Sequence, residues 1–482
     1  MNAATSPWLS LDAVLRVTGG RLWKPDDGAP GARPNVASGA SVGFTACAID
    51  SRSLTGGELF VPLPGTQADG HAFVTAALQG GAAGSLARRG WSVPAAAAAT
   101  GKPIVEVEDP LAALQTLGAH CRERADLPVV AVTGSNGKTT TKEMIAAILA
   151  TGRRVHRNLG NLNNHIGVPL TLLSLVAGHR YAVVEMGANH RGEIAHLASI
   201  AEPGVGIVTN AGAAHLEGFG SLDGVAEGKG ELFAGLPPDG IAVLNADDRY
   251  ASRWRSLAAG RRVVTFGLEG ADYSARDIRS SLDAGTPRLE FELVAPVGAV
   301  RVQLALAGMH NLRNALGAAA AAQAAGASLA DVAAGLAAMK AVKGRLEFKP
   351  AVNGAVLVDD SYNANPGSLK AGLDAFRSFS GARWLVLGDM MELGSAADEL
   401  HREIGAYARE SGVERLLAIG PRAKGAADAF GPGADWFDNV EDLIAEARRS
   451  LRADVAVLVK GSRANRLERV TQALAPESSE VS

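Results

Sequence analysis

Short apolar runs that predict buried strands alternate with stretches of helical periodicity along the middle of the chain. The run at 128–132 precedes residues 139–150, where apolar side chains recur at helical spacing. Further apolar runs follow at 181–184, 205–208 and 241–244. Strands separated by helices favour a parallel sheet with helices on both faces. The pattern therefore predicts a central α/β domain.

The same alternation returns in the last third, while the first hundred residues mix short β-like runs with turn signals. Strand-like runs lie at 356–358, 384–387, 416–419 and 455–459. No GxGxxG motif accompanies them, so dinucleotide binding is not indicated. We expect an α/β protein of three domains, with a mixed α/β domain over 1–109, a central parallel-sheet domain over 110–341 and a smaller doubly wound, Rossmann-like domain over 342–482.

Composition narrows the possible partners and the compartment. The chain has 482 residues, with 47 Lys plus Arg against 50 Asp plus Glu, so its net charge of -3 does not indicate nucleic-acid binding. Its two cysteines, Cys47 and Cys121, exclude a disulfide scaffold and a cysteine zinc site. Residues 1–15 lack the basic and apolar features of a secretory signal. Gln323 and Asp331 interrupt the most apolar long stretch, which is mostly alanine. We expect a cytoplasmic protein without membrane insertion.

The strongest chemical signal follows the strand run at 128–132 and opens the next helix. A glycine-rich loop there lets backbone N–H groups converge on phosphate, and the helix N-terminus adds a positive field. Lys138 would reach the β- and γ-phosphates, and the Thr139 hydroxyl would ligate Mg²⁺. The alternative is a glycine-rich turn, because Val132 occupies a position where the general motif has glycine. The predicted ATP-phosphate residues are Gly134, Ser135, Asn136, Gly137, Lys138, Thr139 and Thr140.

Two further side chains follow predicted strands. Glu185 ends one strand run, and ligands of open parallel sheets lie beyond the carboxyl ends of strands, so we expect Glu185 near the same Mg²⁺. His215 follows another strand and could ligate a second metal ion, although a surface-loop histidine is the alternative. Lys229, taken alone, has the pattern of a solvated helix lysine.

Together these blocks resemble the Mur ligase family, which builds the cytoplasmic peptidoglycan precursor. The run TGSNGKTT is that family's shortened P-loop, which accounts for Val132. Blocks at 158–167, 308–314 and 359–366 extend the resemblance in the same order over nearly the whole chain. The YNANP run at 362–366 and GDMMELG at 388–394 are similar to the members that add D-alanyl-D-alanine.

The resemblance implies an ATP-dependent ligase that joins D-alanyl-D-alanine to UDP-N-acetylmuramoyl-tripeptide through an acyl phosphate, releasing ADP and phosphate. It implies that the first domain binds the UDP substrate and that the central domain binds ATP. It also implies a carbamate on Lys229, since burial would favour the neutral amine that reacts with carbon dioxide. Two Mg²⁺ ions and action as a monomer are further expectations.

The resemblance also assigns roles to individual residues. Lys138, His215 and Lys229 are the implied catalytic residues, and the implied metal ligands are Thr139, Glu185, His215 and Lys229. The implied nucleotide contacts beyond the loop are Asn311, Arg345 and Asp360. The implied UDP-substrate contacts are Ser51, Arg52, Asp69 and His71, for which ordinary turn chemistry is the alternative. The candidates for binding the amine substrate are Tyr362, Asn363 and Asn365, where an Asx turn before Pro366 is the alternative.

Other functions would require motifs or properties of their own. The ligase that adds the third amino acid carries an Asn-Pro-Arg block that is absent here, and a folylpolyglutamate-type relative is a further alternative within the family. A P-loop switch would carry Asn-Lys-x-Asp, and no Asn-Lys dipeptide occurs. A non-enzymatic scaffold would function without Lys138. The sequence leaves open whether the tripeptide ends in lysine or diaminopimelate.

Overall fold

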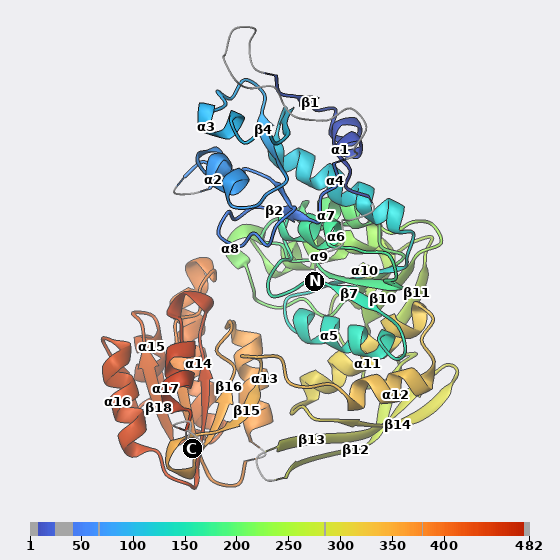
Figure 1. Cartoon of the computed structure of the whole chain (residues 1–482). Coiled ribbons are helices and arrows are strands. Elements are labelled where there is room, and N and C mark those ends of the chain that lie inside the picture. The colour runs from blue at the N-terminus through green and yellow to red at the C-terminus, as the bar shows by residue number, and fades with distance from the viewer. Residues whose placement is uncertain (1–7, 25–41, 66–67, 284–285, 378, 477–482) are drawn as a thin grey trace, which may run out of the picture. The chain divides into compact units, whose positions relative to one another are not determined.

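A computed structural model describes residues 8–24, 42–65, 68–283, 286–377 and 379–476 (Figure 1). Within these, the chain forms two compact units. The first contains described residues of Met1–Ala131, Arg153–Gly187 and Ala195–Pro203. The second contains those of Val132–Gly152, Ala188–Ile194 and Gly204–Ser482, so the chain passes from one unit to the other five times.

The first unit contains a sheet in the order β1-β5-β4-β3-β2. Only β1 runs antiparallel to its neighbour, and the other pairs are parallel. The strands are β1 (Arg21–Leu22), β2 (Cys47–Ala48), β3 (Leu59–Phe60), β4 (Gly84–Arg88) and β5 (Ile104–Val107). The helices with this sheet are α1 (Leu11–Thr18), the 3-10 turn η1 (Gly70–Phe73), α2 (Val74–Gln79) and α3 (Ala95–Ala98).

Helix α4 (Pro110–Ala125) belongs to the core of the same unit. Asp109 caps it by accepting a hydrogen bond from the backbone N–H of Leu111 at 2.9 Å, and proline suits the first turn because it needs no N–H donor there. Leu114 and Leu117 pack with Leu9 in one hydrophobic cluster. The core therefore continues across residue 109, and the domain limits 1–109, 110–341 and 342–482 stay a prediction.

A parallel sheet supplies strands to both units. Strand β6 (Val129–Thr133) contributes to each, because the division falls after Ala131. In the first unit the order is β6-β8-β7, with β7 (Val155–Arg157) and β8 (Tyr181–Glu185) flanked by α6 (Gly167–Leu173). In the second unit the order is β11-β10-β9-β6, with β9 (Val205–Val208), β10 (Ile241–Asn245) and β11 (Arg262–Phe266).

The second unit adds helices and an antiparallel sheet. The P-loop helix α5 (Lys138–Leu149) packs against α11 (Met309–Ala324) and α12 (Leu329–Ala337). The sheet has the order β12-β13-β14 and contains β12 (Ser274–Asp283), β13 (Thr286–Ala295) and β14 (Gly298–Leu304). Other helices near the central strands are α7 (Glu193–Ala201), which crosses the division between the units, α8 (Leu216–Phe219), α9 (Leu222–Ala234) and α10 (Ala251–Leu257).

The last third of the chain forms a doubly wound sheet in the order β15-β16-β20-β17-β18-β19, in which only β15 is antiparallel. Strand β20 returns to lie between β16 and β17, and ligands of such sheets bind where the strand order reverses. The strands are β15 (Glu347–Pro350), β16 (Val356–Asp359), β17 (Ala382–Gly388), β18 (Arg415–Ile419), β19 (Ala434–Phe437) and β20 (Val455–Lys460). The helices are α13 (Pro366–Phe376), α14 (Ala397–Glu410), α15 (Ala423–Phe430), α16 (Val440–Ser450) and α17 (Glu468–Leu474).

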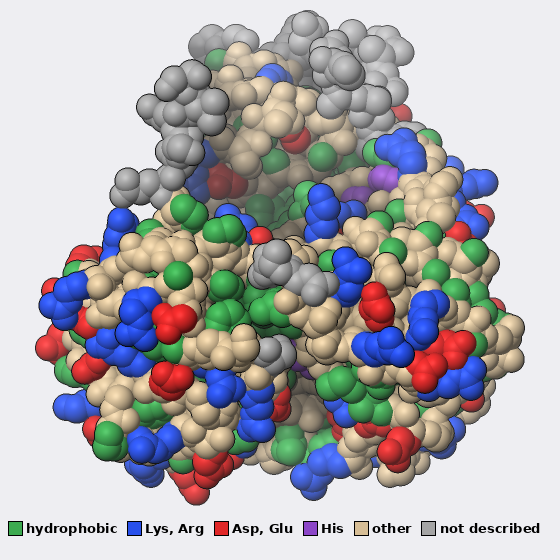
Figure 2. Space-filling model, turned by 90° about the horizontal axis from the view of Figure 1, so that it is seen from below, with side chains coloured by type: hydrophobic (Ala, Val, Ile, Leu, Met, Phe, Trp, Pro, Cys, Tyr) green, Lys and Arg blue, Asp and Glu red, His purple; other side chains and the backbone are tan. Residues whose placement is uncertain are grey.

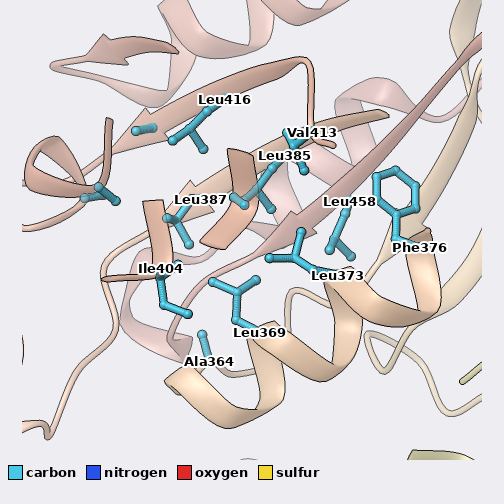
Figure 3. Packing of buried hydrophobic residues seen from close by; sticks show 14 of the residues in the cluster. Ala364, Leu369, Leu373, Phe376, Leu385, Leu387, Ile404, Val413, Leu416 and Leu458 are labelled. Carbon is cyan, nitrogen blue, oxygen red and sulfur yellow. The ribbon is translucent and has the colours of Figure 1, made fainter. Parts of the chain in front are cut away.

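Apolar side chains from both the helices and the strands fill the core of this sheet. Figure 3 shows Leu369 and Leu373 of α13 turned toward Leu385, Leu387 and Leu458 of the strands. A separate cluster, which includes Leu443 and Val470, packs α16 and α17. The predicted apolar runs 384–387 and 455–459, in the central strands β17 and β20, are buried throughout. The α/β fold class is confirmed.

The surface carries charges of both signs. Figure 2 shows acidic and basic side chains interspersed over the face in view. This mixture agrees with the small net charge of -3. In the part of the chain that the structure describes, no helix has the length and apolar character needed to cross a membrane.

Candidate active site

The predicted phosphate-binding loop joins β6 to α5. Gly134 and Gly137 have φ angles of 143° and 80°, which favour glycine. A Cβ atom on Gly134 would lie 1.9 Å from Thr209 Oγ1, and one on Gly137 would lie 2.4 Å from Asn314 Oδ1. The loop therefore needs glycine both for its conformation and for its close approach to β9 and α11.

Hydrogen bonds from the end of β9 hold the same loop. The N–H of Ser135 donates to the carbonyl of Asn210 at 2.9 Å, and Thr209 Oγ1 donates to the carbonyl of Asn136 at 2.6 Å. Lys138 Nζ donates to the carbonyls of Gly134 at 2.6 Å and Ser135 at 3.1 Å. No side chain caps the N-terminus of α5, so its positive end is suited to an anion.

A cavity of about 570 Å³ opens beside the loop, within the second unit. This volume is in the usual range for small-molecule sites, about 300–1,000 Å³. Most nucleotide candidates from the sequence are brought together here. The lining includes Ser135, Asn136, Gly137, Lys138, Thr139, Thr140, Asn311, Arg345 and Asp360, together with His215, Asn363 and Asn365.

The amine-substrate candidates lie at the cavity or directly behind it. Asn365 Nδ2 donates to Asn136 Oδ1 at 2.7 Å, which connects α13 to the phosphate loop. Asn365 also caps α13 by accepting from the N–H of Ser368 at 2.9 Å, so it has a structural role at the start of that helix. The aromatic ring of Tyr362 lies 4.1 Å from the Arg345 guanidinium carbon.

His215 lies at the cavity in an unusual backbone conformation. Its φ angle is 55°, and its Nδ1 contacts a carboxylate oxygen of Glu392, whose φ angle is 63°. Residues other than glycine that adopt left-handed φ values often cluster at functional sites. Burial, supported by nearby Lys138, lowers the pKa of His215, while Glu392 opposes that shift. The neutral imidazole that a metal ligand requires is therefore favoured.

Lys229 is buried in α9 and is not the solvated lysine that its helix alone suggests. Only 1% of the residue is exposed, and its Nζ donates to the carbonyl of Ala188 at 2.9 Å. The ammonium group also lies 4.9 Å from the centre of the Phe219 ring. Burial, with a smaller contribution from Lys138, lowers the pKa of Lys229 to about 7. Burial therefore favours the neutral amine of this lysine.

Glu185 ends β8 in the first unit, at the carboxyl end of a strand as predicted. The residue is 3% exposed, its Oε1 accepts from Asn163 Nδ2 at 2.9 Å, and its backbone N–H donates to Asn158 Oδ1 at 2.7 Å. Among the described residues, no group of three His, Cys, Asp or Glu side chains is arranged to hold a metal ion. A Mg²⁺ ion can also take ligands of other kinds, such as a hydroxyl, a carbamate or phosphate oxygens.

The UDP-substrate candidates also belong to the first unit, where each one shows turn chemistry. The exposed Arg52 guanidinium forms two hydrogen bonds with Asp50, at 2.9 and 2.7 Å, next to Ser51. Asp69 accepts from the N–H of His71 at 3.0 Å and lies 2.7 Å from its Nδ1. The Nε2 of His71 accepts from the N–H of Arg88 at 2.9 Å. Both ring nitrogens of His71 thus have partners within the unit, and the contact of these residues with a uridine nucleotide stays a prediction.

Lys460 is a site residue that the sequence reasoning missed. It ends β20 with only 2% exposure, and its Nζ donates to Asp360 Oδ2 at 2.5 Å and to the carbonyl of Asn363 at 3.0 Å. Burial lowers the pKa of Lys460, and the charge of Asp360 opposes that shift. The sequence did contain one indication of this site, because Lys460 is a charged residue directly after the apolar run 455–459.

Comparison with known proteins identifies the family. Residues 132–322 match the Mur ligase middle domain, residues 344–463 the Mur ligase glutamate ligase domain and residues 44–122 the Mur ligase family catalytic domain. The UDP-N-acetylmuramoyl-tripeptide–D-alanyl-D-alanine ligase of Escherichia coli (strain K12) is 42% identical over 444 residues, which cover 90% of this chain and 95% of that protein.

Solved structures agree with this match. A crystal structure of MurF from Acinetobacter baumannii is similar with a TM-score of 0.85 and 31% identity, covering 97% of this chain and 98% of the other. MurF ligase from Thermotoga maritima, solved in complex with ADP, gives a TM-score of 0.77 and 30% identity, covering 89% and 96%. The resemblance seen in the motifs is confirmed. The chain belongs to the Mur ligase family.

Proposed function

We propose that this protein is an ATP-dependent ligase that joins the amine of D-alanyl-D-alanine to the peptide carboxylate of UDP-N-acetylmuramoyl-tripeptide, for peptidoglycan synthesis. The observation that carries this function is 42% identity, over 90% of the chain, to a ligase named for that reaction. The cavity between the phosphate loop and the end of the last sheet supports it, because ATP and an acceptor need a shared site.

The chemistry explains why a phosphate loop is needed. A carboxylate is a poor electrophile, since its charge repels an amine and oxide is a poor leaving group. Transfer of the γ-phosphoryl group of ATP to the carboxylate oxygen gives an acyl phosphate and ADP. The free amine then attacks the acyl carbon, phosphate leaves and the amide forms. Lys138 and the N-terminus of α5 would neutralise the charges that meet in the first step.

In the second unit, the residues that would hold Mg²⁺ are Thr139, His215 and a carbamylated Lys229. Glu185 of the first unit is a separate candidate ligand. Two bound Mg²⁺ ions would supply positive charge to the phosphate groups and to the acceptor carboxylate. The low pKa of Lys229 supports the carbamate, because its neutral amine can attack carbon dioxide. When the neutral amine adds to carbon dioxide, an N–C bond forms and one proton passes to solvent. The neutral amine thereby becomes an anionic carbamate, which can offer oxygen as a ligand.

We infer that the protein acts in the cytoplasm as a monomer. Neither Cys47 nor Cys121 forms a disulfide, which agrees with a reducing compartment.

The test is product analysis with purified protein. ATP, UDP-N-acetylmuramoyl-tripeptide and D-alanyl-D-alanine should together give the UDP-linked pentapeptide and stoichiometric ADP, detected by mass spectrometry and a coupled assay. Leaving out either acceptor should abolish ADP release. Parallel reactions with lysine- and diaminopimelate-ending tripeptides identify the acceptor. Product from single amino acids but not from the dipeptide would contradict the proposed function.

A further inference from the structure

The incoming dipeptide carries a carboxylate that takes no part in the reaction, and nothing assigned so far holds that group. This question rests on the proposed function, because it takes D-alanyl-D-alanine as the amine substrate. A carboxylate in a partly enclosed site needs a cationic partner. Among the described residues that line the cavity, the lysines and arginines are Lys138, Arg313, Arg345, Lys460 and Arg463.

Both lysines already have partners. Lys138 lies across the phosphate loop, where its Nζ donates to two loop carbonyls at 2.6 and 3.1 Å. Lys460 is 2% exposed and forms a 2.5 Å ion pair with Asp360. A second carboxylate could reach Lys460 only by displacing a buried partner, which is costly.

Two of the arginines are also engaged elsewhere. The guanidinium of Arg345 lies over the ring of Tyr362 at 4.1 Å, and Arg345 is a predicted nucleotide contact. Arg313 Nε donates to Asp247 Oδ2 at 2.9 Å. Asp247 also accepts from the N–H of Leu268, so this group fixes the loops after β10 and β11.

Arg463 differs from these four cations. It begins a 3-10 turn (Arg463–Asn465) shortly after the end of β20, and 65% of its side chain is exposed. Its carboxylate partner, Glu468, lies at 3.4 Å, beyond the usual N–H···O distance of about 2.7–3.2 Å. Because the contact is long and most of the Arg463 side chain is exposed, this pair contributes little, so a ligand can replace Glu468 at small cost. A guanidinium also suits a carboxylate because it can donate two parallel hydrogen bonds.

The backbone beneath Arg463 is held rigidly by a second loop. The N–H of Ser462 donates to the carbonyl of Asp389 at 3.0 Å, and the N–H of Met391 donates to Ser462 Oγ at 2.8 Å. The side chain of Asn465 holds Asp389 on both sides. Its Nδ2 donates to the carbonyl of Asp389 at 2.7 Å, and its Oδ1 accepts from the N–H of Asp389 at 3.1 Å. Segments 388–392 and 460–465 thus form one platform, which contributes Glu392 and Arg463 to the cavity. A binding residue on such a platform is preorganised.

We propose that Arg463 binds the C-terminal carboxylate of the incoming D-alanyl-D-alanine and thereby selects a dipeptide acid as the amine substrate. The platform then determines which end of the dipeptide faces the acyl group. Arg463 is a binding residue in this account, so its loss should act on acceptor affinity and leave the nucleotide steps intact.

The experiment compares D-alanyl-D-alanine with D-alanyl-D-alaninamide, which lacks the charge, in the wild-type enzyme and in R463A. A hydrogen bond to a charged group corresponds to roughly a ten- to hundredfold change in affinity. The KM of wild type for the amide should exceed its KM for the acid by that factor. In R463A the two KM values should become similar, with the acid weakened. KM for ATP and for the UDP substrate should stay within about twofold.

Two further variants complete the design. R463K should recover part of the preference for the acid, since it keeps the charge but loses the paired donors. R452A is the matched control, because Arg452 pairs with Asp454 at 3.2 Å with more than half of both side chains exposed and does not line the cavity. It should match wild type. A persistent preference for the acid in R463A, or an equal rise in KM for ATP, would overturn the assignment. If wild type uses neither dipeptide, the proposed function itself fails.

Discussion

The buried ion pair between Asp360 and Lys460 should be a major determinant of the stability of the last sheet. The two side chains are 11% and 2% exposed and lie 2.5 Å apart at the ends of adjacent strands. Replacing Lys460 with methionine leaves the Asp360 carboxylate buried, with the N–H of Leu346 as its remaining hydrogen-bond donor, at 3.1 Å. Removing one member of a buried pair costs about 3–5 kcal/mol. We expect K460M to destabilise this sheet by that amount.

The stability of the partner variant, D360N, should depend on pH in a specific way. In D360N, Lys460 stays buried and loses the charge that opposes the lowering of its pKa. The unfolded lysine has a pKa near 10.4. Below the lowered folded pKa, D360N therefore carries the full cost of burying an unpaired ammonium. Its stability should rise with pH up to about 10.4, because the unfolded state binds more protons in that window.

Hydrogen exchange followed by mass spectrometry measures the stability of the last sheet separately from the rest of the chain. A local measurement is needed because a chain with several cores need not unfold in one step. Peptides that cover β16 and β20 report the free energy of opening at pH 7 and pH 9, after correction for intrinsic exchange. R452M, on an exposed pair, should change protection by less than about 1 kcal/mol. Equal protection in K460M and wild type, or a D360N deficit that does not shrink at pH 9, would refute the reasoning.

Two further results are expected. K229A should lower kcat by about a hundredfold or more, because a charged ligand is lost from the site. Short carboxylic acids should restore part of the rate of K229A in a turnover assay. Full activity of K229A, or no restoration by the acids, would exclude the carbamate. G335A should cost about 1–3 kcal/mol in thermal unfolding, because its Cβ would lie 2.4 Å from Ile148 Cα in α5. G425A, whose Cβ would have 3.7 Å to its neighbour, is the control and should not destabilise; a similar loss in both variants would contradict this account of packing.

The features that the sequence predicted well are those encoded by adjacent residues. The phosphate loop is encoded by the nine consecutive residues 132–140, which span the end of a strand and the start of a helix. Both of its glycines have the conformations that their positions imply. The predicted runs of the last sheet correspond to β16, β17, β18 and β20, because strands covered on both faces are apolar throughout. The antiparallel sheet was missed, although Leu289, Phe291 and Leu293 alternate as a half-buried strand should.

The features that escaped prediction depend on strand order. Asp360 and Lys460 are a hundred positions apart and meet because β20 lies next to β16, a pairing that no local pattern reveals. The contact between His215 and Glu392 likewise joins loops from different sheets. Burial of Lys229 also depends on distant partners, since the Ala188 carbonyl and the Phe219 ring enclose it. Without those contacts, a lysine in a helix is indistinguishable from a surface residue.

The alternation of the chain between its two units has a consequence for synthesis on the ribosome. Residues 132–140 leave the exit tunnel well before Thr209 and Asn210, whose hydrogen bonds shape the phosphate loop. Asn314 and Asp360, which complete the cavity, follow later still. A nascent chain therefore cannot acquire its nucleotide site by folding residue by residue from the start. Tight ATP capture should begin only once most of the polypeptide has been translated.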